Sequence, residues 1–116
     1  MIQIKRVYEP PKKEDGARIL IDRLWPRGVS KESAKINLWL KEIAPSPALR
    51  IWFSHDPENF QEFRKRYRLE LKKNKKGLSK IKEMENENKT IALLYGAKSP
   101  TYNHAVVLRD YCLGYF

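Results

Sequence analysis

One stretch of seven consecutive residues contains two guanidinium groups, a carboxylate and an indole, which are side chains able to bind a ligand or to take part in a reaction. It reads Asp22-Arg23-Leu24-Trp25-Pro26-Arg27-Gly28. Proline fixes φ and glycine permits a positive φ, so this stretch is predicted to be a turn. Its arginines could hold a phosphate or a carboxylate through paired hydrogen bonds. We therefore expect a ligand site here, in which Arg23, Trp25, Arg27 and Gly28 bind the ligand and Asp22 orients it or the catalytic base.

A second group of polar residues follows an apolar run near the carboxyl end of the sequence. It contains Tyr95, Gly96, Lys98, Asn103 and His104. A histidine in the first turn of a helix can act as a general base, because the positive end of the helix dipole favours the neutral imidazole. His104 is therefore the candidate base, and Tyr95, Lys98 and Asn103 are candidate ligand-binding residues.

Two predicted strands must bring these groups together. Residues 18–24 are apolar at their centre, and residues 90–95 have no polar break, which is typical of strands covered on both faces. If the two strands are parallel neighbours, their carboxyl ends open at one edge of the sheet, where ligands of such sheets bind. The sequence then predicts an anion site between the turn at 22–28 and the helix that begins near His104.

The remaining elements complete an α/β pattern. Residues 2–8 and 36–40 are predicted strands, and Ser30 is expected to start a short helix through Ala34. Helices are also expected wherever a capping side chain precedes proline, as in Ser46-Pro47, Asp56-Pro57 and Ser99-Pro100. The helix from Pro57 is expected to end at Gly77, with a short one around residues 78–84. We expect a single domain over residues 1–116, with a small, mostly parallel sheet flanked by helices.

Composition narrows the class of protein. The chain has 116 residues, of which 41% are hydrophobic and 33% charged, as in soluble globular proteins. No apolar segment approaches the roughly 20 residues of a membrane span, and no targeting leader is apparent, so we expect a cytoplasmic protein without membrane contact. The lone Cys112 excludes an internal disulfide and is expected to be buried and inert. No metal-ligand spacing or cofactor fingerprint occurs, so neither a metal nor a cofactor is expected.

The net charge of +10 comes almost entirely from residues 64–82, which hold ten Lys and Arg but one acid, Glu70. Such a cluster can be a solvated helix face. It can also bind the phosphates of a nucleic acid, with Trp25 as a stacking residue. The candidate contacts for that alternative are Arg64, Arg68, Lys72, Lys73, Lys75 and Lys76.

Several of these residues also have purely structural interpretations. Asp22 could pair with a neighbouring arginine, Trp25 could anchor its turn, and the imidazole of His104 could bond a backbone carbonyl. His55 is expected to be a surface histidine, and Trp39 and Trp52 are expected in the core or an interface.

The chain resembles the YeaO-like branch of domain-of-unknown-function family 488. The motifs that carry the resemblance are the stretch at 22–28, Ala44-Pro45-Ser46, Trp52-Phe53, His55-Asp56-Pro57, Phe63-Arg64 with Tyr67, the run from Leu93 to Lys98, and Asn103-His104-Ala105. The resemblance implies a small α/β domain but brings no established reaction. Wider relatives carry Cys-His-Arg where this chain has Asn103-His104-Ala105, which argues against a cysteine nucleophile here.

Three classes of function follow from these observations. The first is binding or processing of a small anionic ligand at the sheet edge, which the convergence of polar residues favours. The second is nucleic-acid binding through residues 64–82. The third is a protein-interaction module without catalysis.

Overall fold

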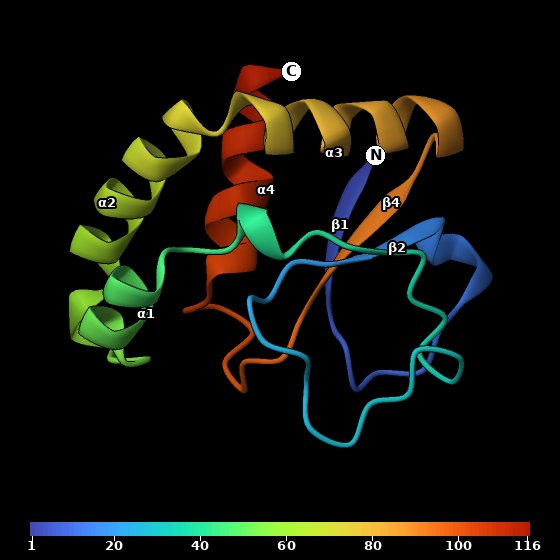
Figure 1. Ribbon diagram of the computed structural model, residues 1–116, viewed down its shortest axis with the longest axis horizontal. Coiled ribbons are helices and arrows are strands. Elements are labelled where there is room, and N and C mark those ends of the chain that lie inside the picture. Colours follow the sequence, from blue (N-terminus) through green and yellow to red (C-terminus); the bar gives the residue numbers. More distant parts are fainter.

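The computed structural model describes all 116 residues and is built on a four-stranded parallel sheet (Figure 1). The strands lie in the order β1-β4-β2-β3, and every neighbouring pair is parallel. The small parallel sheet predicted from the sequence is therefore confirmed. The strand bounds are β1 Ile2–Arg6, β2 Ala17–Leu20, β3 Leu38–Trp39 and β4 Ile91–Tyr95.

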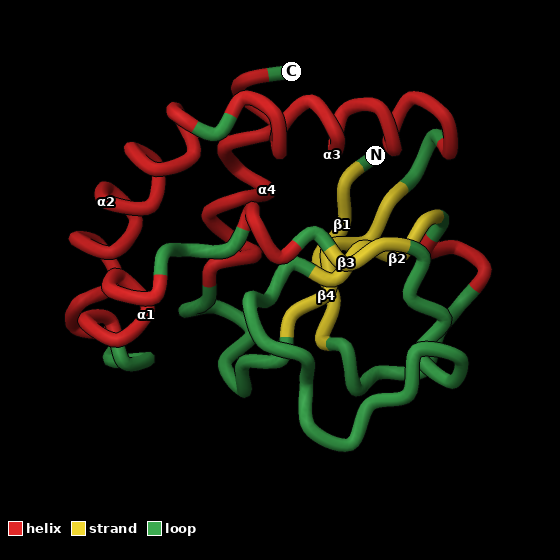
Figure 2. The backbone as a smooth tube through the Cα atoms, viewed as in Figure 1, coloured by secondary structure: helices red, strands yellow, loops and turns green.

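Helices account for most of the rest of the chain. Their bounds are α1 Pro47–Phe53, α2 Phe60–Lys73, α3 Lys75–Asn88 and α4 His104–Tyr115, with single 3₁₀ turns at Lys13–Asp15, Lys41–Ile43 and Pro57–Asn59. None of these helices is both long and apolar enough to cross a membrane. Figure 2 shows that long loops gather at the carboxyl ends of the strands, opposite α3. The predicted ligand edge is therefore bordered mainly by loops.

The two faces of the sheet are covered differently. On one face α3 and α4 contact the strands, and Ile19, Leu93 and the aromatic residues of α2 belong to one continuous core. On the other face Leu20 and Leu94 pack in a smaller cluster, which the loop between β2 and β3 covers without a helix. Because successive strand residues point to opposite faces, the unbroken apolar runs are explained by burial on both sides.

A buried ionic cluster links β1 to the start of β2. Asp15 accepts hydrogen bonds from Lys5 at 3.0 Å and from Arg18 at 2.6 Å. Arg18 is only 2% exposed, and its Nε donates to the carbonyl of Ala34 at 2.7 Å. Burial of a charge is tolerated only when it is paired in this way.

Proline-led helix starts are confirmed at two of three places. The Ser46 hydroxyl accepts the N–H of Leu49 at 3.2 Å and caps α1. Asp56 likewise caps the 3₁₀ turn that leads into α2. The third prediction is wrong, because Ser99 bonds the N–H groups of Thr101 and Tyr102 within a local bend. Four residues later Asn103 caps α4, accepting from Val106 at 3.1 Å.

Several other boundaries are also corrected. Residues 30–34 form turns and not a helix, although Ser30 does accept the N–H of Ser33. The helix before Gly77 ends at Lys73, and Gly77 lies inside α3, which is long and not short. A Cβ at Gly77 would lie 2.8 Å from the Ile43 side chain, so this glycine serves close packing. The strand predicted over 18–24 ends at Leu20, and that over 36–40 shrinks to two residues.

Candidate functional site

The two polar segments predicted to face each other meet at the carboxyl edge of the sheet. β2 and β4 are parallel neighbours, with Leu20 paired to Leu94. Just beyond them Asp22 Oδ2 accepts the N–H of Gly96 at 2.9 Å, and Asp22 Oδ1 lies 3.1 Å from His104 Nε2. Asp22 therefore connects the end of β2, the end of β4 and the first turn of α4.

His104 is held mainly by the backbone. Its Nε2 lies 3.1 Å from the carbonyl oxygen of Ile21 in hydrogen-bonding geometry. Asp22 Oδ1 is equally near, but it is buried without a hydrogen bond of its own. Both neighbours of Nε2 are acceptors, so the proton of the neutral ring belongs on Nε2 and only Nδ1 keeps a free lone pair. The structure thus shows the arrangement that the sequence left open as an alternative, in which the His104 imidazole bonds a backbone carbonyl.

A pocket of about 280 Å³ opens beside Asp22 and His104. The ends of the strands, the helices α1 and α2 and the start of α4 all contribute to its wall, so the pocket lies where segments distant in sequence converge. Its lining residues are Tyr8, Asp22, Arg23, Leu24, Trp25, Pro26, Ala44, Pro45, Arg50, Phe53, His55, Phe63, Gly96, Ala97, Asn103 and His104. Of the residues predicted to form a site, Asp22, Arg23, Trp25, Asn103 and His104 are thus brought together.

Two arginines give the pocket its positive charge. Arg23 is tethered through Nε to the carbonyl of Pro45 at 3.3 Å and through Nη2 to that of Ala44 at 3.1 Å. These bonds use carbonyl acceptors, so no carboxylate neutralises the guanidinium, and its Nη1 has no partner. The side chain of Arg50, from α1, makes neither a hydrogen bond nor an ion pair. Asp22 is the one carboxylate in the lining.

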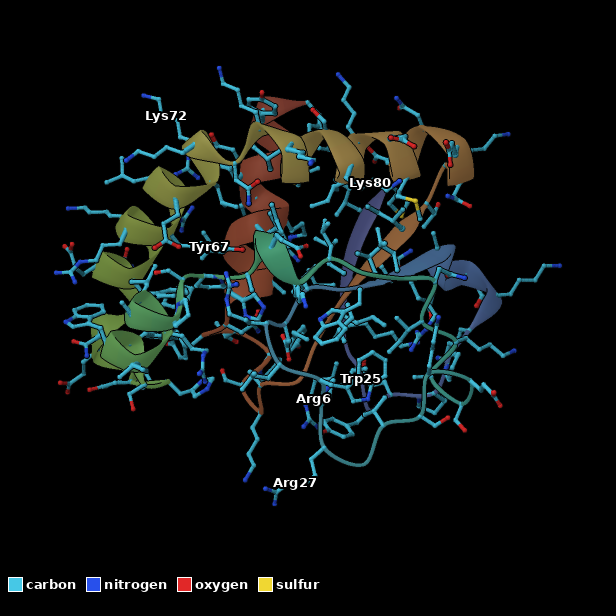
Figure 3. The ribbon with its side chains drawn as sticks, viewed as in Figure 1. Arg6, Trp25, Arg27, Tyr67, Lys72 and Lys80 are labelled. Atoms are coloured by element: carbon cyan, nitrogen blue, oxygen red, sulfur yellow. The ribbon has the colours of Figure 1, made fainter.

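Aromatic side chains form the apolar wall. Phe53 and Phe63 stack with ring centroids 4.2 Å apart. Trp25 is 36% exposed, donates its indole N–H to the carbonyl of Val29 at 2.8 Å, and meets Trp39 edge-on. In Figure 3 Trp25 lies among the loops at the carboxyl edge of the sheet. The indole is therefore fixed in orientation while one part of it stays open to a ligand.

The end of α1 carries local strain. Ser54 and His55 both have a positive φ, of 48° and 57°, which is unusual for residues other than glycine. Two consecutive left-handed residues turn the chain sharply, and the result places the exposed His55 on the pocket wall. Such strain persists only where the surroundings enforce it, and it is concentrated at functional sites.

Four residues predicted to bind a ligand do not line the pocket. Arg27 is exposed and, in Figure 3, extends away from the body of the protein. Gly28 has φ 75°, with no other atom within 4 Å of the point where a Cβ would lie, and Lys98 is exposed. Tyr95 is 3% exposed within the core, and burial raises the pKa of its hydroxyl.

Residues that the sequence interpretation did not place in the site include Tyr8, Arg50, Phe53, His55 and Phe63. Of these five, only His55 stood out in the sequence, where it is predicted to be a surface histidine. The basic residues 64–82 lie on α2 and α3, apart from the pocket lining. No group of three or more His, Cys, Asp and Glu side chains is placed to hold a metal ion.

Fold and pocket together define a small parallel α/β protein with a basic, aromatic-walled pocket at the carboxyl edge of its sheet. Residues 1–115 match the family described as "Inactive DUF488-N3 subclade". The uncharacterised protein YeaO of Escherichia coli (strain K12) is 42% identical over 110 residues, which cover 95% of each chain. Uncharacterised proteins of Mycobacterium bovis and Mycobacterium tuberculosis are 46% identical over 70 residues, covering 60% of this chain and 59% of theirs. No solved structure matches significantly. The chain belongs to this YeaO-like subclade of the DUF488 family.

Proposed function

We propose that the pocket binds a small anion that carries a flat apolar group, and that it does so without catalysing a reaction. The observation that carries the proposal is the pair Arg23 and Arg50, whose guanidinium groups line the pocket with no carboxylate bound to either. Guanidinium groups bind phosphates and carboxylates through paired N–H donors, which makes an anion the expected occupant.

The charge balance of the pocket supports an anion over a cation. Asp22 already accepts from Gly96 and contacts His104, so its charge is partly satisfied within the protein. The first N–H groups of α4, at His104 and Ala105, have no acceptor and add positive potential at the same edge.

The apolar wall of the pocket indicates which group the ligand should carry in addition to its negative charge. Trp25, which is 36% exposed, offers aromatic surface next to the arginines, and the buried stack of Phe53 and Phe63 lies behind the pocket wall. A ring-bearing phosphate or carboxylate would cover this surface and gain apolar burial at about 25 cal/mol per Å². An inorganic anion would not, so it should bind more weakly.

Two observations favour binding without catalysis. Asn103 occupies the position of the thiol in wider relatives, and both ends of its side chain are used structurally, one to cap Val106 and one to bond Ser99. The Nε2 of His104 is directed at the Ile21 carbonyl. The description of the subclade as inactive agrees with this proposal.

Thermal unfolding with phenyl phosphate, benzoate and inorganic phosphate tests the proposal. A ligand at ten times its Kd should add about 1.4 kcal/mol of stability, which raises Tm by several degrees for a chain of this size. Phenyl phosphate should stabilise more than inorganic phosphate. The variant Arg50→Ala should lose the shift, while Arg27→Ala, which removes the same charge outside the pocket, should keep it. Equal losses in the two variants, or no shift with any ring-bearing anion, would reject the proposal.

A further inference from the structure

The far end of α4 forms a second surface, which the pocket does not use. Its aromatic side chains lie in a ladder: Tyr111 and Tyr115 stack with centroids 5.8 Å apart, and Phe116 meets Tyr115 edge-on at 6.0 Å. Tyr115 is 53% exposed. In Figure 1 this end of α4 lies beside the junction of α2 and α3. We call Tyr111, Tyr115 and Phe116 the aromatic ladder.

Cationic side chains from both neighbouring helices flank the aromatic ladder. The guanidinium of Arg68, on α2, lies 5.2 Å from the ring centroid of Tyr111. The ammonium of Lys82, on α3, lies 5.8 Å from that of Phe116. Arg64 and Lys72 precede and follow Arg68 by four residues, so the three form one stripe along α2. The basic segment thus borders the ladder on two sides.

Most of this charge is not neutralised within the protein. Of the ten Lys and Arg in residues 64–82, only Arg66 and Lys80 contact a carboxylate. Nearby acids are engaged elsewhere: Glu70 accepts from Ser46, and Asp110 contacts Arg109. The surface therefore attracts polyanions electrostatically.

We propose that the aromatic ladder and the flanking cations bind a single-stranded nucleic acid. Unpaired bases stack on exposed aromatic faces, and phosphates bind a row of unpaired cations, which is the combination found in single-strand-binding surfaces. A duplex hides its base faces and could use only the charges. The ladder therefore favours a single strand over a duplex, without requiring a particular sequence.

Fluorescence anisotropy with labelled oligo-dT and oligo-rU of about 15 nucleotides, and with a duplex of equal length, tests this proposal. Both single strands should bind, because stacking uses the ring face that every base has. If four phosphates are contacted, log Kd should rise with log salt at a slope of about 3. Tyr115→Ala should weaken binding by about 5- to 150-fold, because one stacked base is lost.

Two matched controls separate stacking and charge from general damage. Leu113→Ala removes another exposed apolar side chain of α4, 64% exposed, and should change Kd by less than about twofold. Lys82→Glu should weaken binding about tenfold, whereas Lys80→Glu, on the face of α3 turned toward the sheet (Figure 3), should do so far less. Circular dichroism would verify folding of each variant. Equal affinity for duplex and single strands, an unchanged Kd in Tyr115→Ala, or binding to anionic vesicles but not to oligonucleotides would overturn the proposal.

Discussion

Replacing Asp22 by alanine should loosen the edge of the sheet on which the pocket depends. The carboxylate is 20% exposed and accepts the backbone N–H of Gly96 at 2.9 Å. A hydrogen bond to a charged group contributes about 1.5–3 kcal/mol, and the substitution also leaves the N–H without its acceptor. We therefore expect Asp22→Ala to lower the free energy of unfolding by about 2–3 kcal/mol.

Urea denaturation followed by tryptophan fluorescence would measure this loss. Asp22→Asn keeps an oxygen for Gly96 and should cost about half as much, since the bond survives without its charge. Asp110→Ala is the matched control, because its carboxylate is 34% exposed beside Arg109 and should change stability by less than about 0.5 kcal/mol. A loss below about 1 kcal/mol in Asp22→Ala would refute the view that this carboxylate joins the two strand ends.

Three further outcomes follow from other parts of the fold. Gly16→Ala should lower the free energy of unfolding by more than about 3 kcal/mol, because φ is 66° and a Cβ would lie 1.9 Å from the Thr90 carbonyl oxygen. Gly28→Ala, at φ 75° in open space, should lower it by about 1–2 kcal/mol. Chemical denaturation of both variants compares the two losses. Burial acts to raise the pKa of Asp15, but hydrogen bonds from the backbone and from its cationic partners outweigh burial, so the pKa is lowered. The ionised carboxylate therefore stabilises the fold above the unfolded pKa of about 3.9, and this contribution is lost as pH falls through the folded pKa. Urea titrations from about pH 5 down to about pH 2 should show a shallower loss of stability in Asp15→Asn, which starts less stable. Burial raises the pKa of Cys112 to about 12, so iodoacetamide should modify the native thiol only as fast as the protein opens; modification as fast as in urea would contradict that burial.

The sheet was predictable because its signals are local and strong. The apolar run in β4 and the one around Ile19 have no polar break, and strands buried on both faces are parallel in α/β proteins. Adjacency of the two strands then places Asp22 and His104 at one edge. Fold class and the meeting of these two segments could therefore be predicted from sequence.

Helix boundaries were less predictable, because a capping side chain does not by itself extend a helix. Ser30 and Ser99 both accept backbone N–H groups, yet each closes only a local turn. Whether a helix continues depends on an apolar face to bury, which the residues after Ser99 lack until Ala105. Gly77 was mistaken for a stop because its tight packing against Ile43 depends on tertiary structure.

The pocket itself was only half predictable. Arg50 and His55 enter it because α1 packs against α2 and the chain then turns through two left-handed residues, neither of which is encoded in a local pattern. Arg27 illustrates the converse. It belongs to the same turn as Trp25, but its backbone carbonyl is bonded by Tyr8 while its side chain extends outward. Residue type and spacing therefore identified the edge of the sheet but not every side chain that faces the pocket.

A ¹H–¹⁵N NMR titration with phenyl phosphate tests the central claim most directly, since it locates the bound anion residue by residue. The pocket predicts saturable shifts at the Trp25 indole N–H and at the side chains of Arg23 and Arg50, and any shifts at residues 64–82 should be smaller and should not saturate over the same ligand range. Shifts confined to residues 64–82, or none at millimolar ligand, would contradict an anion site at the carboxyl edge of the sheet.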